Sequence, residues 1–183
     1  INRFVAFLYT PVQRLHEIRI RAGDQLIHQL HHADFAPECV INGRHFQAGA
    51  DLAWISGVAK QSPAENERAS RLTAEAIRRL DTCPVPTLAL VQGGCFGGGT
   101  GIVAACDVVV ASEDAIFSIA ETRWGLMAGI ILPQLCRAMG VRQVRRYALT
   151  GERFGAQEAR RLGLVHEVCP TGGLEAAGAR ISE

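Results

Sequence analysis

The sequence predicts an α/β fold in which strands and helices alternate. Residues 87–92 and 107–112 are short and almost wholly apolar, which indicates strands that are covered on both faces. Residues 18–30, 64–80 and 136–149 have the length and apolar spacing of helices and lie between the strand-like runs. Strands with helices packed on both faces define the α/β class.

The individual elements follow from local signals along the chain. The aromatic-rich run at 4–9 is closed by Thr10-Pro11, which favours a strand and a turn. The helix at 64–80 ends before Pro84 and Pro86, because proline cannot continue a helix. The full prediction is strands at 4–9, 40–41, 87–92, 107–112, 115–119 and 164–168, and helices at 18–30, from 52–55 onward, 64–80, 102–106, 136–149 and 156–162.

Composition excludes several classes of protein. The 183 residues are 48% hydrophobic and 20% charged, which is typical of a globular domain and not of a disordered chain. A net charge of +1 disfavours nucleic-acid binding through phosphate neutralisation. The absence of a run of eighteen apolar residues or of a visible signal peptide predicts no membrane partner. Six dispersed cysteines indicate reduced thiols in a cytoplasmic protein.

A glycine-rich turn at residues 93–101 stands between an apolar strand and an apolar helix. Unpaired N–H groups at a helix N-terminus favour either a phosphate or a carbonyl oxygen that becomes anionic during reaction. Neither phosphate-binding motif is present. G-x-x-x-x-G-K-[ST] requires a lysine, and none follows the run. G-x-G-x-x-G, begun at Gly97 or Gly99, requires a final glycine where the chain has Ile102 or Ala104. A purely structural role in helix–sheet packing stays open. A second small-residue turn, at 46–52, makes a two-donor oxyanion hole possible, and each donor contributes about 3–4 kcal/mol to the transition state.

Four motifs occur in a fixed order along the chain. They are F-x-A-G-A-D-L from Phe46, G-x-x-x-G-G-G-x-x-[IL] from Gly93, C-D-[VI]-x-x-A-x-x-x-A-x-F from Cys106, and E-x-x-x-G-L from Glu121. In order and spacing the chain resembles the crotonase (enoyl-CoA hydratase/isomerase) superfamily from about Val40 to Val168. The resemblance implies a ββα spiral core with surrounding helices over residues 1–169. Residues 170–183 are expected to begin a C-terminal helical region that is incomplete here.

The resemblance also implies the site. The N–H groups of Ala50 and Gly98 form the oxyanion hole, and Glu121 is the catalytic acid/base. Hydratases of the superfamily usually carry a further glutamate where this chain has Gly101. This departure, with Pro133, places the chain nearest to branched glutaconyl-CoA hydratases. The remaining candidates for substrate contact are Ala48, Gly49, Asp51, Leu52, Gly97 and Trp124, of which Asp51 is also suited to cap a helix and Trp124 to pack in the core.

The expected reaction is hydration or dehydration of a branched 2-enoyl-CoA through an enolate, with Glu121 as the single acid/base. Two alternatives remain: an enoyl-CoA Δ-isomerase that uses the same glutamate, and an acyl-CoA-binding homologue without catalysis. Coenzyme A is expected as part of the substrate thioester and not as a resident cofactor. No metal site is expected, including at His28, His31 and His32, whose helical spacing alone is weak evidence. The resemblance implies a homotrimer or hexamer.

Overall fold

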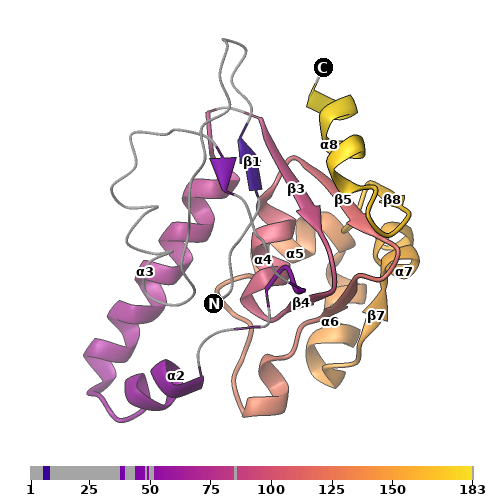
Figure 1. Cartoon of the computed structure of the whole chain (residues 1–183). Coiled ribbons are helices and arrows are strands. Elements are labelled where there is room, and N and C mark those ends of the chain that lie inside the picture. The colour runs from indigo at the N-terminus through magenta and orange to yellow at the C-terminus, as the bar shows by residue number, and fades with distance from the viewer. Residues whose placement is uncertain are drawn as a thin grey trace.

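The chain is built on two β-sheets of unequal size (Figure 1). A computed structural model describes residues 6–8, 38–39, 44–47, 49, 52–84 and 86–182. Within these residues, five strands pair in the order β2-β1-β3-β5-β8 and three in the order β4-β6-β7. The strands are β1 (Ala6–Leu8), β2 (Glu38–Cys39), β3 (Thr87–Val91), β4 (Gly94–Phe96), β5 (Val108–Ser112), β6 (Ile116–Ser118), β7 (Phe154–Gly155) and β8 (Glu167–Cys169).

From β3 to β6, consecutive strands alternate between the two sheets. β3 and β5 pair in parallel in the larger sheet, with Leu88 opposite Val108, and β4 and β6 pair in parallel in the smaller one, with Phe96 opposite Ser118. The helix α4 (Gly98–Ala105) connects β4 to β5. This repeating ββα path is the spiral that the resemblance implies.

The helices surround the sheets (Figure 1). The longest, α3, begins with a capping box in which Ser62 and Glu65 satisfy each other's backbone N–H groups. No helix in the described part of the chain is long and apolar enough to cross a membrane. The helices are α2 (Leu52–Val58), α3 (Pro63–Asp81), α4, the 3₁₀ helix η1 (Glu121–Trp124), α5 (Leu132–Met139), α6 (Val141–Thr150), α7 (Ala156–Arg161) and α8 (Leu174–Ser182).

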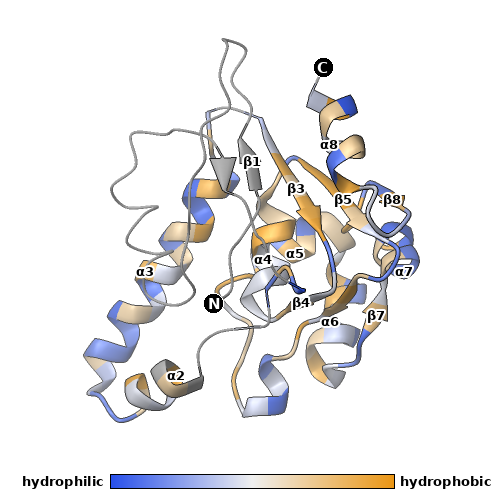
Figure 2. Cartoon of the chain, viewed as in Figure 1, coloured by the Kyte–Doolittle hydropathy of each residue, from blue (hydrophilic) through white to orange (hydrophobic). Residues whose placement is uncertain are grey.

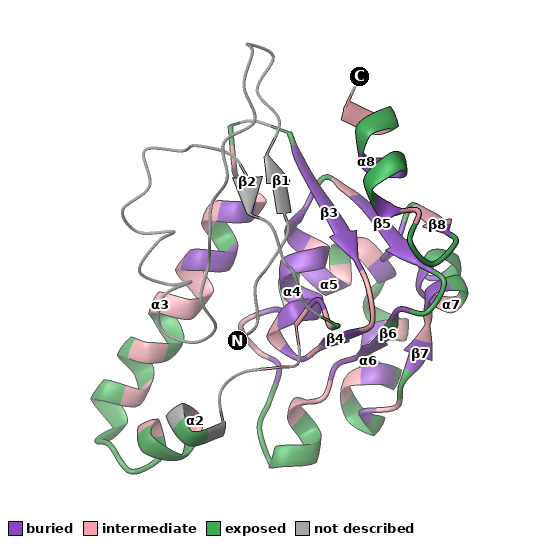
Figure 3. Ribbon diagram, in the orientation of Figure 1, coloured by how far each residue is buried: buried purple, intermediate pink, exposed green. Residues whose placement is uncertain are grey.

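Burial on both faces explains why β3 is apolar after its first residue, Thr87. All five of its residues are buried (Figure 3), and β3 and β5 are the hydrophobic centre of the larger sheet (Figure 2). Leu88 and Leu90 pack with Leu174 of α8, whereas Ala89 and Val91 belong to the main core with residues of α3, α4 and α5. The prediction of strands covered on both faces is therefore confirmed.

Five free cysteines are described, and three of them, Cys95, Cys106 and Cys169, are buried. Burial raises the pKa of the Cys106 thiol to about 12 and also raises the pKa of Cys95. Thiols in this state are poor nucleophiles, because the thiolate is the reactive form. The reduced state of the cysteines stays a prediction.

Asp107 fastens the start of β5 to the start of β3. Its Oδ2 accepts hydrogen bonds from the Thr87 N–H at 2.8 Å and from the Thr87 hydroxyl at 2.7 Å, and its own N–H donates to Thr87 Oγ1 at 2.8 Å. Because Thr87 is only 1% exposed, its polar groups depend on this partner.

Asp107→Ala is therefore expected to lower the free energy of unfolding by about 1–3 kcal/mol, because it removes the acceptor of a buried N–H and a buried hydroxyl. Asp107→Asn retains one side-chain oxygen in the same place and is expected to cost less. Urea denaturation of both variants measures the difference. Equal losses in the two variants would show that the hydrogen bonds are not the cause.

The structure corrects the predicted start of the helix after the glycine-rich turn. The sequence predicts a helix from residue 102, but α4 begins at Gly98. Glycine is a poor helix former, yet two glycines of this first turn are required by close packing. A Cβ at Gly99 would lie 2.7 Å from the Cβ of Gln47, and one at Gly101 would lie 2.1 Å from Cγ2 of Ile131.

Three further predictions are corrected or extended. The helix predicted at 136–149 is two helices, α5 and α6, which are separated by Gly140 at a φ of +80°. The last strand begins at Glu167 and not at Leu164, because the N–H groups of Leu164 and Val165 donate back to the Ala159 carbonyl oxygen in α7 and do not pair with β5. The elements β4, β7 and η1 were not predicted, and β4 lies inside what the sequence indicated as a glycine-rich turn. The predicted helix at 18–30 and the strand at 40–41 lie outside the described residues.

Candidate active site

The glycine-rich turn joins the end of β4 to the first turn of α4. Gly97 has a φ of +53°, and its N–H donates to the carbonyl oxygen of Ser118 at the end of β6. Its carbonyl oxygen accepts from the buried hydroxyl of Thr100 at 2.7 Å. Gly98 follows as the first residue of α4, where a backbone N–H has no partner within the helix. A Cβ at Gly98 would meet no atom within 4 Å, so its backbone borders open space.

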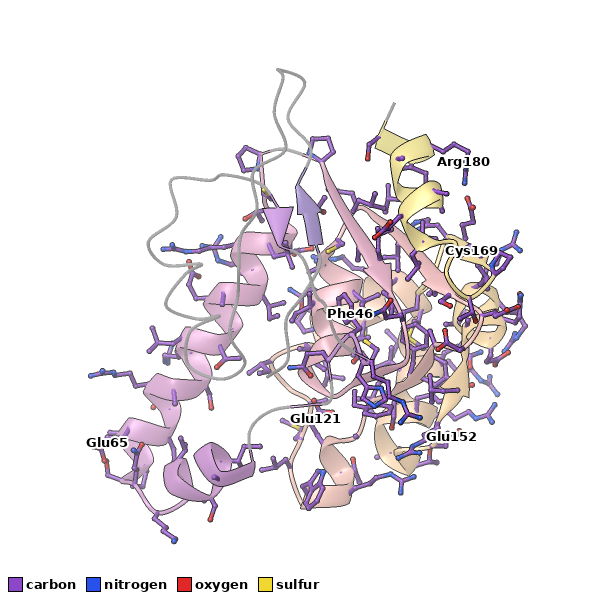
Figure 4. The ribbon with its side chains drawn as sticks, viewed as in Figure 1. Phe46, Glu65, Glu121, Glu152, Cys169 and Arg180 are labelled. Atoms are coloured by element: carbon purple, nitrogen blue, oxygen red, sulfur yellow. The ribbon has the colours of Figure 1, made fainter. Side chains whose placement is uncertain are left out.

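Glu121 lies directly against this turn. A Cβ at Gly97 would be 3.1 Å from Oε1 of Glu121, so any larger residue here would crowd the carboxylate. The parallel pairing of β4 with β6 brings the two residues together, because each follows the end of its strand. Figure 4 shows Glu121 within the molecule, whereas Glu65, Glu152 and Arg180 lie at its periphery.

The Glu121 carboxylate has the environment of a proton-transfer group. Its Oε2 is buried and has no hydrogen-bond partner. Burial raises the pKa of Glu121, and a hydrogen bond from its own backbone N–H opposes this only in part. A carboxyl group with a raised pKa and an unpaired oxygen binds a proton more readily than an ordinary carboxyl group, which suits a group that takes up and returns a proton.

The second turn begins on a segment that is fastened to β4. The Phe46 N–H donates to the Gln92 carbonyl oxygen at 2.9 Å, the Gln47 N–H donates to Gly94 O at 3.0 Å, and the Phe96 N–H donates to Gln47 O at 2.8 Å. Phe46 is 1% exposed and belongs to the main core. Residues 46–47 therefore lie beside β4, next to the Gly97–Gly98 turn that follows it.

His45 and Gln47 add side-chain contacts to this segment. His45 Nδ1 accepts from the Gly94 N–H at 2.9 Å, and Gln47 Oε1 accepts from the Gly49 N–H at 2.5 Å. Gly49 has a φ of +105°, which favours glycine. Ala48, Ala50 and Asp51 lie outside the described residues, so the oxyanion role of Ala50 and the cap at Asp51 stay predictions.

Comparison with known proteins identifies the family. A family model described as enoyl-CoA hydratase/isomerase matches residues 36–181. The chain belongs to the enoyl-CoA hydratase/isomerase family. Its fold is therefore of the crotonase type, as predicted. A nearest relationship to glutaconyl-CoA hydratases is not confirmed by these comparisons.

Known relatives include both hydratases and isomerases. The chain is 36% identical to the peroxisomal Δ(3,5)-Δ(2,4)-dienoyl-CoA isomerase of Arabidopsis thaliana, over 69% of this chain and 49% of that protein. It is 35% identical to the hydroxycinnamoyl-CoA hydratase-lyase of Pseudomonas fluorescens, over 67% and 48%. The crystal structure of an enoyl-CoA hydratase from Shewanella pealeana superposes with a TM-score of 0.73 at 41% identity, over 76% of this chain and 52% of that one. The chain thus spans about half the length of these relatives.

The structure gathers some of the predicted residues and separates others. Gly97, Gly98 and Glu121 meet at one place, and Gly49 is reached through Gln47. Leu52 is the first residue of α2. Trp124 is 61% exposed at the end of η1, so its alternative role in core packing is wrong. Its contact with substrate stays a prediction.

An apolar groove lies next to η1 but is separate from the turn. Its volume is about 550 Å³, and neither Glu121 nor the Gly97–Gly98 turn lines it. Met127 and Leu149 are 80% and 74% exposed at this groove. The remaining lining residues come from η1, the following loop, α5 and α6: Thr122, Leu126, Ala128, Leu132, Cys136, Val141, Val144, Arg145 and Ala148.

Two residues near the site were missed by sequence reasoning. Gln47 occupies the variable position of F-x-A-G-A-D-L, where an amide two residues before a glycine could have suggested a local hydrogen bond. Ile131 is fully buried and packs on Gly101, the position at which hydratases of the family usually carry the further glutamate. This contact joins residues thirty positions apart, and no local pattern indicates it.

Proposed function

We propose that this chain forms the core of an enzyme that hydrates or dehydrates a 2-enoyl-CoA thioester, with Glu121 as the single acid/base. The observation that carries the proposal is the buried, unpartnered Oε2 of Glu121 beside the N-terminal turn of α4. A free carboxylate next to outward-facing N–H groups suits a reaction in which a proton moves while an adjacent oxygen gains charge.

In the proposed reaction, the thioester oxygen accepts hydrogen bonds from the N–H groups of Gly98 and Ala50. Glu121 removes a proton from water while the water oxygen bonds to the β-carbon of the substrate. The electron pair of the double bond shifts to the thioester oxygen and forms an enolate, which the two N–H groups stabilise. Glu121 then returns the proton to the α-carbon, so one carboxyl serves both steps. Dehydration is the reverse sequence.

Isomerisation of an enoyl-CoA is the second candidate, and the contact between Ile131 and Gly101 favours it. The space beside Gly101 is filled by an apolar side chain and holds no second acid. Moving a double bond requires only that one base take a proton from one carbon and return it to another, without a bound water. The single carboxylate of this site meets that requirement.

The test offers the intact protein a panel of acyl-CoA esters in deuterated water. We expect solvent deuterium at the α-carbon, because each reaction passes through an enolate-type anion, a β-hydroxy enolate in hydration and a dienolate in isomerisation, and Glu121 moves a proton at that carbon. Hydration is then recognised by a mass gain of one water and loss of enoyl absorbance, and isomerisation by a shifted double bond without water uptake. Tight binding of esters without exchange or turnover would contradict the proposal and support a non-catalytic acyl-CoA-binding role.

Coenzyme A enters this proposal only as part of the substrate. The homotrimer or hexamer that the resemblance implies, the acyl group and a cytoplasmic location remain predictions. Analytical ultracentrifugation of the intact protein tests the first of these directly.

A further inference from the structure

We propose that Gln47 is a positioning residue that couples the two turns of the oxyanion hole. The inference rests on the proposed function and adds a residue to it. Gln47 is half-buried and contacts both turns: its Oε1 accepts from the Gly49 N–H at 2.5 Å, and its side chain lies against Gly99 in the first turn of α4.

The backbone of Gln47 is held from both directions by β4. Its N–H donates to Gly94 O at 3.0 Å, its carbonyl oxygen accepts from the Phe96 N–H at 2.8 Å, and it forms a parallel bridge with Cys95. Cys95 is fully buried, so this anchor belongs to the core. Because the backbone of Gln47 is fixed, the positions that its side-chain amide can occupy are restricted.

From this anchor the amide controls the conformation at Gly49. The Gly49 N–H is held by Gln47 while φ at Gly49 is +105°, a value open mainly to glycine. Holding the Gly49 N–H and its φ fixes the Cα and carbonyl carbon of Gly49 relative to Gln47, so that only ψ of Gly49 is left to orient the next peptide unit. That unit carries the N–H of residue 50, which is the second donor of the proposed oxyanion hole.

The second contact of Gln47 places the Gly49 turn against the first turn of α4, which carries the N–H of Gly98. A Cβ at Gly99 would lie 2.7 Å from Cβ and 3.3 Å from Oε1 of Gln47, so the side chain rests on the helix backbone one residue after Gly98. One side chain thus touches both turns whose N–H groups must converge on a single oxygen. A shift of about 1 Å between catalytic groups can cost a hundredfold in rate.

Gln47→Met and Gln47→Glu separate this role from simple packing. Methionine approximates the shape of glutamine but cannot accept the Gly49 N–H in the same way. Glutamate retains an acceptor oxygen but adds a charge near the oxygen that becomes anionic. Gln157→Met, on the exposed surface of α7, is the matched control.

We expect Gln47→Met to lower kcat by about 10–100-fold with little change in KM, because the lost contact acts on the transition state. Amide exchange at Gly49, followed by NMR, is expected to accelerate in this variant and not in Gln47→Glu. The activity of Gln47→Glu relative to the wild type is expected to recover as the pH falls and the introduced carboxylate is protonated. Gln157→Met should match the wild type throughout.

A Gln47→Met variant with kcat within twofold of the wild type would overturn the inference. A loss of kcat that only follows the loss of folded protein, or that is equal and pH-independent in both Gln47 variants, would reduce Gln47 to a structural role. If the wild-type protein exchanges no α-proton from any ester, the proposed function fails and the inference falls with it. The wild-type measurement therefore distinguishes the two failures.

Discussion

Replacing Glu121 with glutamine is expected to lower turnover by about 10²–10⁴-fold, because it removes the only carboxyl that the structure places at the Gly97–Gly98 turn among the described residues. Glutamine keeps the size and shape of the side chain but cannot take up or return a proton. Steady-state rates with the best ester of the panel measure the loss. Glu175→Gln, on the exposed face of α8, is the control and should leave the rate unchanged.

The same substitution has a distinct effect on stability. Burial raises the pKa of Glu121 above its ordinary value of 4.5, so the folded protein holds this proton at a pH where the unfolded chain has lost it. The free energy of unfolding therefore falls as pH rises from the unfolded pKa through the folded pKa. Glu121→Gln removes this dependence. The variant is expected to be as stable as the wild type at low pH and at least as stable at neutral pH.

These two results together identify the role of Glu121. Low turnover with full stability indicates a group that is maintained for chemistry at a cost to the fold. In the wild type, kcat/KM is expected to fall on the acid side with a pKa above 4.5, because the ionised carboxylate must accept the first proton. Turnover of Glu121→Gln close to that of the wild type would remove Glu121 from the mechanism.

The sequence predicted that Gly97 and Glu121 lie close together, because the order of the motifs along the chain reflects the order in which the strands pair. The two residues are 24 positions apart, but each follows a strand, and the strands pair in parallel. Any chain that keeps these motifs in the same ββα order places the two positions together. The order of the motifs, through the resemblance it carries, therefore predicted that these two positions lie close together, and their catalytic roles stay predictions.

The contacts that sequence reasoning missed are those of tertiary packing. Glycine at 98, 99 and 101 suggests a turn by propensity, yet these residues form the first turn of α4. Glycine stands at 99 and 101 because neighbouring side chains leave no room there for a Cβ. The break at Gly140 was missed for the opposite reason. The pattern on either side of it continues as a helix, and only the positive φ of one residue interrupts it.

Gly101→Ala is expected to lower the free energy of unfolding by about 1–3 kcal/mol, because the added methyl group would overlap a buried side chain. Its Cβ would lie 2.1 Å from Cγ2 and 2.5 Å from Cβ of Ile131, which is fully buried. The Cβ of Ile131 cannot move without its backbone, so α4 and α5 must separate. Gly57→Ala, at an exposed site in α2 with no atom within 4 Å, is the control and should be neutral or stabilising.

A double-mutant cycle with Ile131→Ala tests whether this contact is the cause. Ile131→Ala alone is expected to cost about 2–5 kcal/mol through the cavity it leaves. In the double variant the 2.1 Å overlap with Cγ2 is gone although the 2.5 Å approach to Cβ of residue 131 remains, so the total loss should be smaller than the sum of the single losses by about 0.5–3 kcal/mol. Denaturant unfolding of the four proteins gives this difference. Strict additivity would show that the two side chains do not compete for the same space.

The same contact determines what an added acid at position 101 can do. Gly101→Glu places a longer side chain against Ile131 and is expected to destabilise the fold more than Gly101→Ala. It is therefore not expected to create a two-glutamate hydratase. A folded Gly101→Glu variant with faster water addition would show that the space beside Gly101 opens readily, and the argument from Ile131 in favour of isomerisation would fail. A rate of water addition no higher than that of the wild type, in a variant that still folds, would confirm that this site operates with one carboxyl.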